Sequence, residues 1–269
     1  MDFRKIAFLG CGNMGSALAR AAAKRTTNLM LTNRTPAKAE ALAQELGVEC
    51  GGNESAARSY DLLFLGVKPQ IMGEVLQEIA PILRARAARQ DRFILVSMAA
   101  GVPIARIRAL AEGDFPVIRI MPNTPAAIGE GMILTCAEGV TDEELKSFTE
   151  VMGAAGRFDF LPEALIDAGS AVSGCGPAFV YPFIEALADG AVACGLPRDK
   201  AQLYAAQTLV GAARLVLESG QHPGALKDAV CSPGGSTIQG VRALEKGGFR
   251  SSVQEAVIAA YERTKELGK

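Results

Sequence analysis

Histidine and tryptophan are nearly missing from the sequence, which has one histidine, His222, and no tryptophan. Histidine is the commonest metal ligand and the side chain most often used as a general acid or base near neutral pH. The composition therefore argues against a histidine-based metal site or catalytic dyad, and we predict no metal. His222 follows Gly-Gln and precedes proline, which is typical of an exposed turn.

Paired cysteines are missing too, because the six cysteines contain no C-x-x-C pair and have apolar or glycine-rich neighbours. That pattern favours free thiols in a reducing compartment over a disulfide framework. The first five residues lead directly into a strand-like run without the features of a signal peptide. We expect a cytoplasmic protein.

Excess charge of one sign is absent, since 28 Lys and Arg residues face 29 Asp and Glu residues. A nucleic-acid-binding surface normally needs a clear basic excess, so we expect no such partner. The longest uncharged candidate span, residues 168–184, is interrupted by glycine and proline and is short for a spanning helix. We predict no membrane partner.

Short apolar runs alternate with helical patterns in the first part of the chain. The run at 62–67 is apolar without alternation, which is typical of a strand buried on both faces. This order predicts a Rossmann-type, doubly wound and mostly parallel sheet over residues 1–160. The predicted strands are 6–9, 29–31, 62–67, 93–98, 117–121, 132–134 and 158–160.

Strand patterns stop after about Pro162, and the remaining sequence predicts an all-helical domain over residues 161–269. Alanine-rich stretches such as 186–192 are apolar on more than one face. Such helices need packing partners on several sides, so we expect self-association through this domain. The predicted helices are 178–194, 198–219, 237–246 and 252–266.

A glycine-rich turn lies between the first predicted strand and the first predicted helix. It fits G-x-G-x-x-G, in which glycines allow a tight turn and close approach of a dinucleotide pyrophosphate to the helix N-terminus. An ordinary tight turn is the alternative. The predicted cofactor residues here are Gly10, Cys11, Gly12, Asn13, Met14 and Gly15.

Asn33 and Arg34 come shortly after the second predicted strand, and no acidic residue follows that strand before Glu40. An NAD site usually has an acid there, whereas arginine suits the 2′-phosphate of NADP. We therefore predict NADPH as the cofactor and keep NADH as an alternative. A solvated surface arginine is the other interpretation of Arg34.

Two further strand ends are predicted to line the cofactor crevice. Val67 ends the predicted strand 62–67, and Lys68 and Pro69 follow it; Lys68 could equally be an exposed lysine at a helix start. The small residues around Met98, Ala99 and Ala100 leave room for a nicotinamide ring.

Several motifs together resemble the Δ1-pyrroline-5-carboxylate reductase family over essentially the whole chain. They are the glycine turn, Val-Lys-Pro-Gln at 67–70, Met-Pro-Asn-Thr-Pro at 121–125, the stretch 171–179 and Ser-Pro-Gly-Gly-Ser-Thr-Ile at 232–238. The last is the most specific. One departure is Cys175, where the family usually has serine, and this puts any hydroxyl role there in doubt.

The resemblance implies NAD(P)H-dependent reduction of a cyclic imine to L-proline, and a helical domain that forms a dimer. By matching positions, Asn53, Val67, Lys68 and the Ala99–Ala100 segment would contact the cofactor. Ser236 and Thr237 would contact the substrate, and Ser173, in the 171–179 motif, is a further substrate candidate.

The chemistry suits an imine better than a ketone. A ketone needs a proton donor as hydride arrives, whereas a cyclic imine binds already protonated. The turn with Gly234 and Gly235 then offers backbone N–H groups to a carboxylate, and Thr237 offers a hydroxyl, which makes it the predicted catalytic residue. The alternative is that Ser236 or Thr237 is an ordinary helix N-cap.

Two rival functions remain from the sequence. A β-hydroxyacid or related imine dehydrogenase would carry a catalytic lysine on the first long helix after the nucleotide domain, but residues 167–191 contain no lysine. The other rival is a redox-sensing module that binds NADPH without turnover, which only a turnover assay separates from an enzyme.

Overall fold

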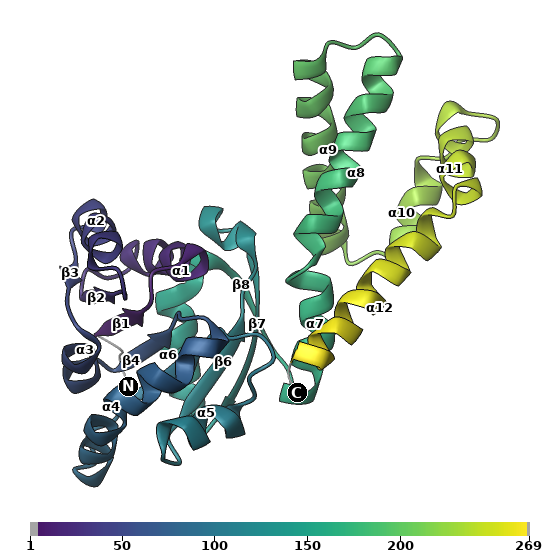
Figure 1. Cartoon of the computed structure of the whole chain (residues 1–269). Coiled ribbons are helices and arrows are strands. Elements are labelled where there is room, and N and C mark those ends of the chain that lie inside the picture. The colour runs from purple at the N-terminus through teal and green to yellow at the C-terminus, as the bar shows by residue number, and fades with distance from the viewer. Residues whose placement is uncertain (1–4, 268–269) are drawn as a thin grey trace. The chain divides into compact units, whose positions relative to one another are not determined.

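The computed structural model describes residues 5–267, and the chain divides into two compact units (Figure 1). The sheet unit comprises residues up to Cys175 together with those from Ala260 onward, and the helical unit is Gly176–Ala259. The predicted entry of residues 1–4 into the first strand lies outside the described residues.

The sheet unit contains an eight-stranded sheet in the order β3-β2-β1-β4-β5-β6-β7-β8. Neighbouring strands are parallel except β6 and β7, which are antiparallel. Because β1 pairs with β2 on one side and β4 on the other, the chain reverses direction across the sheet at β1, which is where doubly wound folds bind ligands. The strands are β1 (Ile6–Leu9), β2 (Leu29–Thr32), β3 (Glu49–Cys50), β4 (Leu62–Leu65), β5 (Ile94–Ser97), β6 (Val117–Met121), β7 (Gly131–Glu138) and β8 (Gly156–Phe160).

Helices cover both faces of this sheet, which explains why the strands are apolar without alternation. Ile6 and Phe8 pack with α1 (Asn13–Ala23), α2 (Pro36–Leu46) and α6 (Asp142–Met152). Ala7 and Leu9 pack on the opposite face with α3 (Asn53–Ser59), α4 (Pro69–Ala88) and α5 (Ile104–Ala111). Every residue of β1 is thus fully buried, as strands covered on both faces require.

Helix α7 (Glu163–Ser173) is not among the helices predicted from the sequence, and it packs on the sheet through Ile166. Its anchor is Arg119 of β6, 3% exposed, whose guanidinium lies 3.1 Å from Glu163 and 3.1 Å from Asp167. Because α7 belongs to the sheet unit, the compact units divide after Cys175. The boundary at residue 160 between a nucleotide-binding domain and a helical domain stays a prediction.

The helical unit contains α8 (Gly176–Ala193), α9 (Arg198–Ser219), α10 (Pro223–Ala229), α11 (Ser236–Lys246) and the start of α12 (Phe249–Leu267). Its buried cluster consists of three alanines among the described residues, Ala188, Ala201 and Ala205. Large apolar side chains face outward, including Tyr181, Leu203, Tyr204, Leu215, Leu217, Val230 and Val253. A unit with so little interior of its own matches the expectation that another subunit supplies cover.

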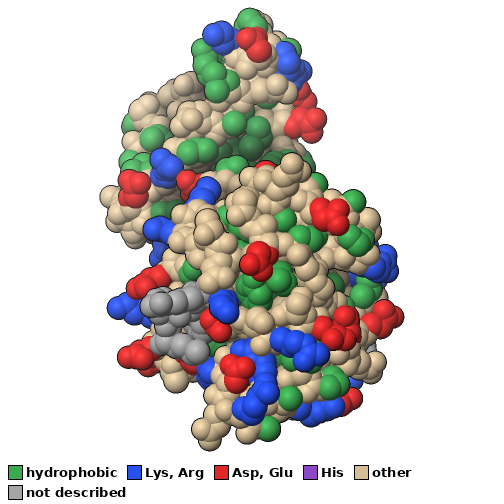
Figure 2. All heavy atoms as spheres, turned by 90° about the vertical axis from the view of Figure 1, so that its left-hand side faces the viewer, with side chains coloured by type: hydrophobic (Ala, Val, Ile, Leu, Met, Phe, Trp, Pro, Cys, Tyr) green, Lys and Arg blue, Asp and Glu red, His purple; other side chains and the backbone are tan. Residues whose placement is uncertain are grey.

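Among the described residues, one helical stretch, Glu163–Ala193, is long and apolar enough by length and composition to cross a membrane, and 11% of its 18-residue apolar window is buried. The stretch comprises α7 and α8, and Gly174 and Cys175 interrupt the helix between them. An apolar helix pair that associates with a second copy would have the same composition. Figure 2 shows basic and acidic side chains interspersed on one face, in line with the near balance of 28 basic and 29 acidic residues.

Candidate cofactor cavity and substrate loop

A cavity of about 600 Å³ lies at the carboxyl ends of β1, β2 and β4 in the sheet unit. This is the position at which the order of the strands reverses, and hence the expected dinucleotide crevice. The structure brings eight predicted cofactor residues together in its lining: Gly10, Cys11, Gly12, Asn33, Arg34, Asn53, Val67 and Lys68. Lys68 also precedes the first residue of α4, so its two interpretations are compatible.

Two of the motif glycines are required by packing of the turn itself. Gly10 has φ +106°, and a Cβ there would lie 2.8 Å from the carbonyl carbon of Gly66. A Cβ on Gly15 would lie 2.3 Å from the carbonyl oxygen of Gly10. The turn between β1 and α1 therefore packs directly on the loop after β4 and on its own helix.

Gly12 is different, because a Cβ there would meet no atom beyond its two neighbours in the chain within 4 Å. Its φ of −75° is open to any residue, so neither packing nor backbone conformation explains the glycine. Gly12 lines the cavity and precedes α1, whose first turn has no acidic residue and no side-chain cap. The free N–H groups and open approach fit the diphosphate of a dinucleotide.

The end of β2 forms the wall that would recognise the adenosine ribose. The Asn33 side chain accepts from the backbone N–H of Cys11 at 3.3 Å and donates to the Thr35 carbonyl at 3.0 Å. Arg34 is exposed and lines the cavity, as does Lys38 in the first turn of α2. Lys38 is not among the cofactor residues predicted from the sequence, although its place two residues after Pro36 marks it as a cation at a helix start.

Cys11 holds its thiol in the neutral form beside the predicted phosphate position. Burial raises the pKa of Cys11 to about 11, and Cys50 adds a smaller contribution in the same direction. Its Sγ donates to the Thr32 carbonyl at 3.5 Å. The protonated thiol adds no negative charge to repel a diphosphate.

Other predicted cofactor residues do not line this cavity. Asn13 lines an adjoining hollow of about 560 Å³ that also includes Lys38. Met98 and Ala99 follow β5, where Met98 packs against the core and Ala99 is 3% exposed. Their contacts with a nicotinamide stay predictions, as do those of Met14, Gly15, Pro69 and Ala100.

The predicted substrate loop forms the start of α11 in the helical unit. Gly234 has φ +71°, a conformation that favours glycine, and the N–H of Gly235 donates to the Ser232 carbonyl at 3.0 Å. The N-cap is Gly235 and makes no side-chain capping bond. The N-cap alternative for Ser236 or Thr237 is therefore wrong, because both residues lie inside the first turn.

Ser236 and Thr237 are exposed and are the first two residues of α11, whose N-cap makes no side-chain capping bond. Such a helix start can hold a carboxylate by its backbone and leave the side chains for a second contact. Ser173 lies in the sheet unit, where its hydroxyl donates to the Gly169 carbonyl at 3.2 Å and its carbonyl accepts from Asn123 at 2.9 Å.

A Rossmann sheet with this glycine turn and cavity defines a dinucleotide-dependent oxidoreductase. Residues 5–101 match the family model described as NADP oxidoreductase, coenzyme F420-dependent, and residues 163–267 match the one described as pyrroline-5-carboxylate reductase dimerisation. Among the described residues, no group of three or more His, Cys, Asp or Glu is arranged to hold a metal ion.

Pyrroline-5-carboxylate reductases match the chain over its whole length. The one from Methanosarcina acetivorans is 41% identical and the one from Escherichia coli 39% identical, with at least 99% of each chain covered. The Plasmodium falciparum pyrroline carboxylate reductase with NADP bound superposes with a TM-score of 0.86 at 33% identity, and the Coxiella burnetii enzyme with 0.90 at 31%; both cover 100% of both chains.

The chain belongs to the pyrroline-5-carboxylate reductase family. The resemblance, the fold class, the oxidoreductase function and the NAD(P) cofactor expected from the sequence are thereby confirmed.

Proposed function

We propose that the chain transfers hydride from NADPH to the C=N bond of 1-pyrroline-5-carboxylate, giving L-proline as the last step of proline biosynthesis. The proposal rests mainly on one observation: the same chain contains a cavity suited to a dinucleotide and a Ser-Pro-Gly-Gly-Ser-Thr turn at the start of α11 that no side chain caps. Full-length similarity to reductases of this substrate supports it.

The proposed reaction needs no proton transfer from a protein side chain as the hydride is transferred. Bound NADPH supplies a hydride, which adds to the carbon of the protonated C=N group while the ring nitrogen keeps its proton. In our proposal, the N–H groups at the start of α11 bind the substrate carboxylate and the Thr237 hydroxyl hydrogen-bonds the ring nitrogen. Gly12 and the start of α1 bind the cofactor diphosphate.

The direct test is steady-state oxidation of NADPH with pyrroline-5-carboxylate, run beside a panel of 2-hydroxy and 3-hydroxy acids with NADP⁺. Turnover of the imine alone supports the proposal. Turnover of a hydroxy acid instead would indicate a β-hydroxyacid-type dehydrogenase. Tight binding of NADPH with no turnover of any substrate would indicate a binding module.

Replacing Thr237 by alanine should lower kcat/KM about ten- to a hundredfold, because one hydrogen bond to a charged partner is lost. The melting temperature should stay unchanged, since Thr237 caps no helix. The matched control is Thr208→Ala, an exposed threonine on α9 whose hydroxyl donates to the Tyr204 carbonyl of the same helix. A Thr237→Ala protein with full kcat/KM would remove Thr237 from the mechanism.

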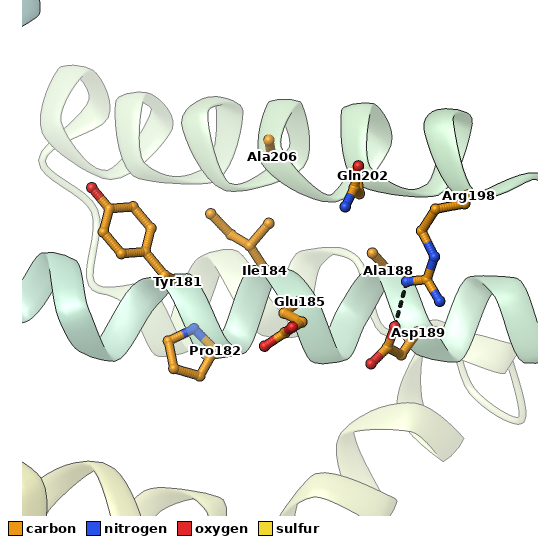
Figure 3. Close-up of a pocket in the computed structure, with 9 residues that line it drawn as sticks. All are labelled: Tyr181, Pro182, Ile184, Glu185, Ala188, Asp189, Arg198, Gln202 and Ala206. Atoms are coloured by element: carbon orange, nitrogen blue, oxygen red, sulfur yellow. Dashed lines mark hydrogen bonds and ion pairs between the residues drawn. The ribbon is translucent and has the colours of Figure 1, made fainter.

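We also propose that the helical unit forms the dimer. A groove between α8 and α9 is lined by Tyr181, Ile184 and Ala188 at one wall and by Gln202 and Ala206 opposite, with the Arg198–Asp189 ion pair at one end (Figure 3). An open groove rimmed by exposed apolar side chains suits burial by a second copy.

Sedimentation of the full chain at micromolar concentration should accordingly show a dimer or a larger assembly. The Ile184→Glu variant, altered in the groove, should sediment as smaller species than the wild type. The control is Glu218→Gln, an exposed position on α9 outside the groove. A stable monomer with full activity would contradict the proposal.

Cytoplasmic location is the final part of the proposal. All six cysteines are free, and Cys50 and Cys194 are exposed, which suits a reducing compartment. Fractionation of cells that express the chain tests it, and recovery with the membranes would contradict it.

A further inference from the structure

Two acidic side chains line the proposed cofactor cavity, although no acidic residue follows β2 before Glu40. Glu74 and Glu78 lie one turn apart on α4, together with Ile71 and Val75 on the same face. The other charged residues of the lining are Arg34, Lys38 and Lys68. A cavity lined by three cationic and two acidic side chains has more than the positive charge that binding a phosphate requires.

Glu78 is tied to the end of β2 through one intermediate side chain. The Thr32 hydroxyl donates to Oδ1 of Asn53 at 2.6 Å, and Nδ2 of Asn53 donates to Oε2 of Glu78 at 2.8 Å. A carboxylate only accepts hydrogen bonds, so Glu78 fixes which way the Asn53 amide points. The Glu78 carboxylate is thereby held next to the strand end that faces the adenosine ribose in this fold.

We propose that Glu78 is a specificity-determining residue that reads the 2′ position of the adenosine ribose. The inference rests on the proposed function, because it takes the cavity as the cofactor site. Glu78 supplies from α4 the acidic group that NAD sites usually carry after β2. It accepts a hydrogen bond from a 2′-hydroxyl and repels a 2′-phosphate, whereas Arg34 and Lys38 do the reverse.

Neutralising the carboxylate with Glu78→Gln should therefore strengthen discrimination in favour of NADP⁺. Glu78 is exposed and its field is screened, so the ratio of the Kd for NAD⁺ to the Kd for NADP⁺ should rise about three- to tenfold. Isothermal titration calorimetry with each oxidised cofactor measures this ratio without turnover. Arg34→Ala should lower the same ratio, because it removes the opposing cation.

The matched control is Glu54→Gln, which makes the same change of charge on α3, next in the chain to Asn53. Glu54 is exposed, pairs with Arg58 and does not line the cavity. The ratio of the Kd for NAD⁺ to the Kd for NADP⁺ in Glu54→Gln should stay at the wild-type value. Glu78→Asp, which keeps the charge, should stay closer to wild type than Glu78→Gln.

The outcomes separate this inference from the function on which it rests. A wild-type protein that binds and oxidises NADPH, with an unchanged Kd ratio in Glu78→Gln, overturns the role of Glu78 alone. An equal shift in Glu54→Gln also overturns it, since the effect would then be one of general charge. A wild-type protein that binds neither cofactor overturns both proposals.

Discussion

Replacing Gly12 by valine is expected to abolish cofactor binding in a protein that still folds. The added side chain would enter open space in the cavity, where no atom beyond the two neighbouring residues lies within 4 Å of the Cβ position. That space is where a diphosphate must approach the start of α1. We expect the Kd for NADP⁺ to rise at least about a hundredfold, which corresponds to about 2.7 kcal/mol.

The loss of stability should be small, because valine in place of glycine at the N-cap lowers the free energy of unfolding by about 1 kcal/mol. Gly15→Ala is the contrasting variant, since its Cβ would lie 2.3 Å from the backbone oxygen of Gly10 and must distort the turn. Calorimetry for binding and melting curves for stability separate the two variants. Near-normal NADP⁺ affinity in Gly12→Val would show that the diphosphate binds elsewhere.

Replacing Arg119 by methionine should destabilise the sheet unit by about 3 kcal/mol, since it breaks a buried ion-pair cluster from one side. Arg119 is 3% exposed and holds both Glu163 and Asp167 of α7. Those carboxylates are 29% and 33% exposed, so water partly compensates them and the loss falls at the lower end of the usual range. Urea unfolding monitored by circular dichroism measures it.

Arg20→Met is the matched control, because the Arg20–Glu45 pair is 45% and 51% exposed and should contribute less than about 1 kcal/mol. Adding Glu163→Gln and Asp167→Asn to Arg119→Met should restore part of the loss, since no unpaired charge then remains. Equal destabilisation by Arg119→Met and Arg20→Met would mean that the cluster does not anchor α7.

The sequence predicts those parts of the fold whose signals are local. The apolar run 62–67 indicated a strand buried on both faces, and β4 is one. The first βα turn was placed correctly because its glycines meet constraints within a few residues, such as the contact of Gly15 with Gly10. The end of the strands near Pro162 also follows from composition.

The parts that the sequence did not predict depend on contacts between distant segments. Nothing near Arg119 indicates that Glu163 and Asp167, more than 40 residues later, will surround it and hold α7 on the sheet. Glu78 enters the cavity from α4, where the pattern reads as an ordinary exposed helix face. Even the N-cap at α11 was ambiguous, because only backbone geometry tells Gly235 from Ser236.

The three-alanine interior of the helical unit has a consequence for its mutational tolerance. Residues that face water in a single copy, such as Leu203, Leu217 and Val253, would obey the packing rules of a core once a second copy covers them. A polar substitution at such a position would then lower the stability of the folded protein as well as its association, because both would depend on the same apolar contacts. In a sequence survey, these outward positions should then be as restricted to apolar residues as buried core positions are expected to be.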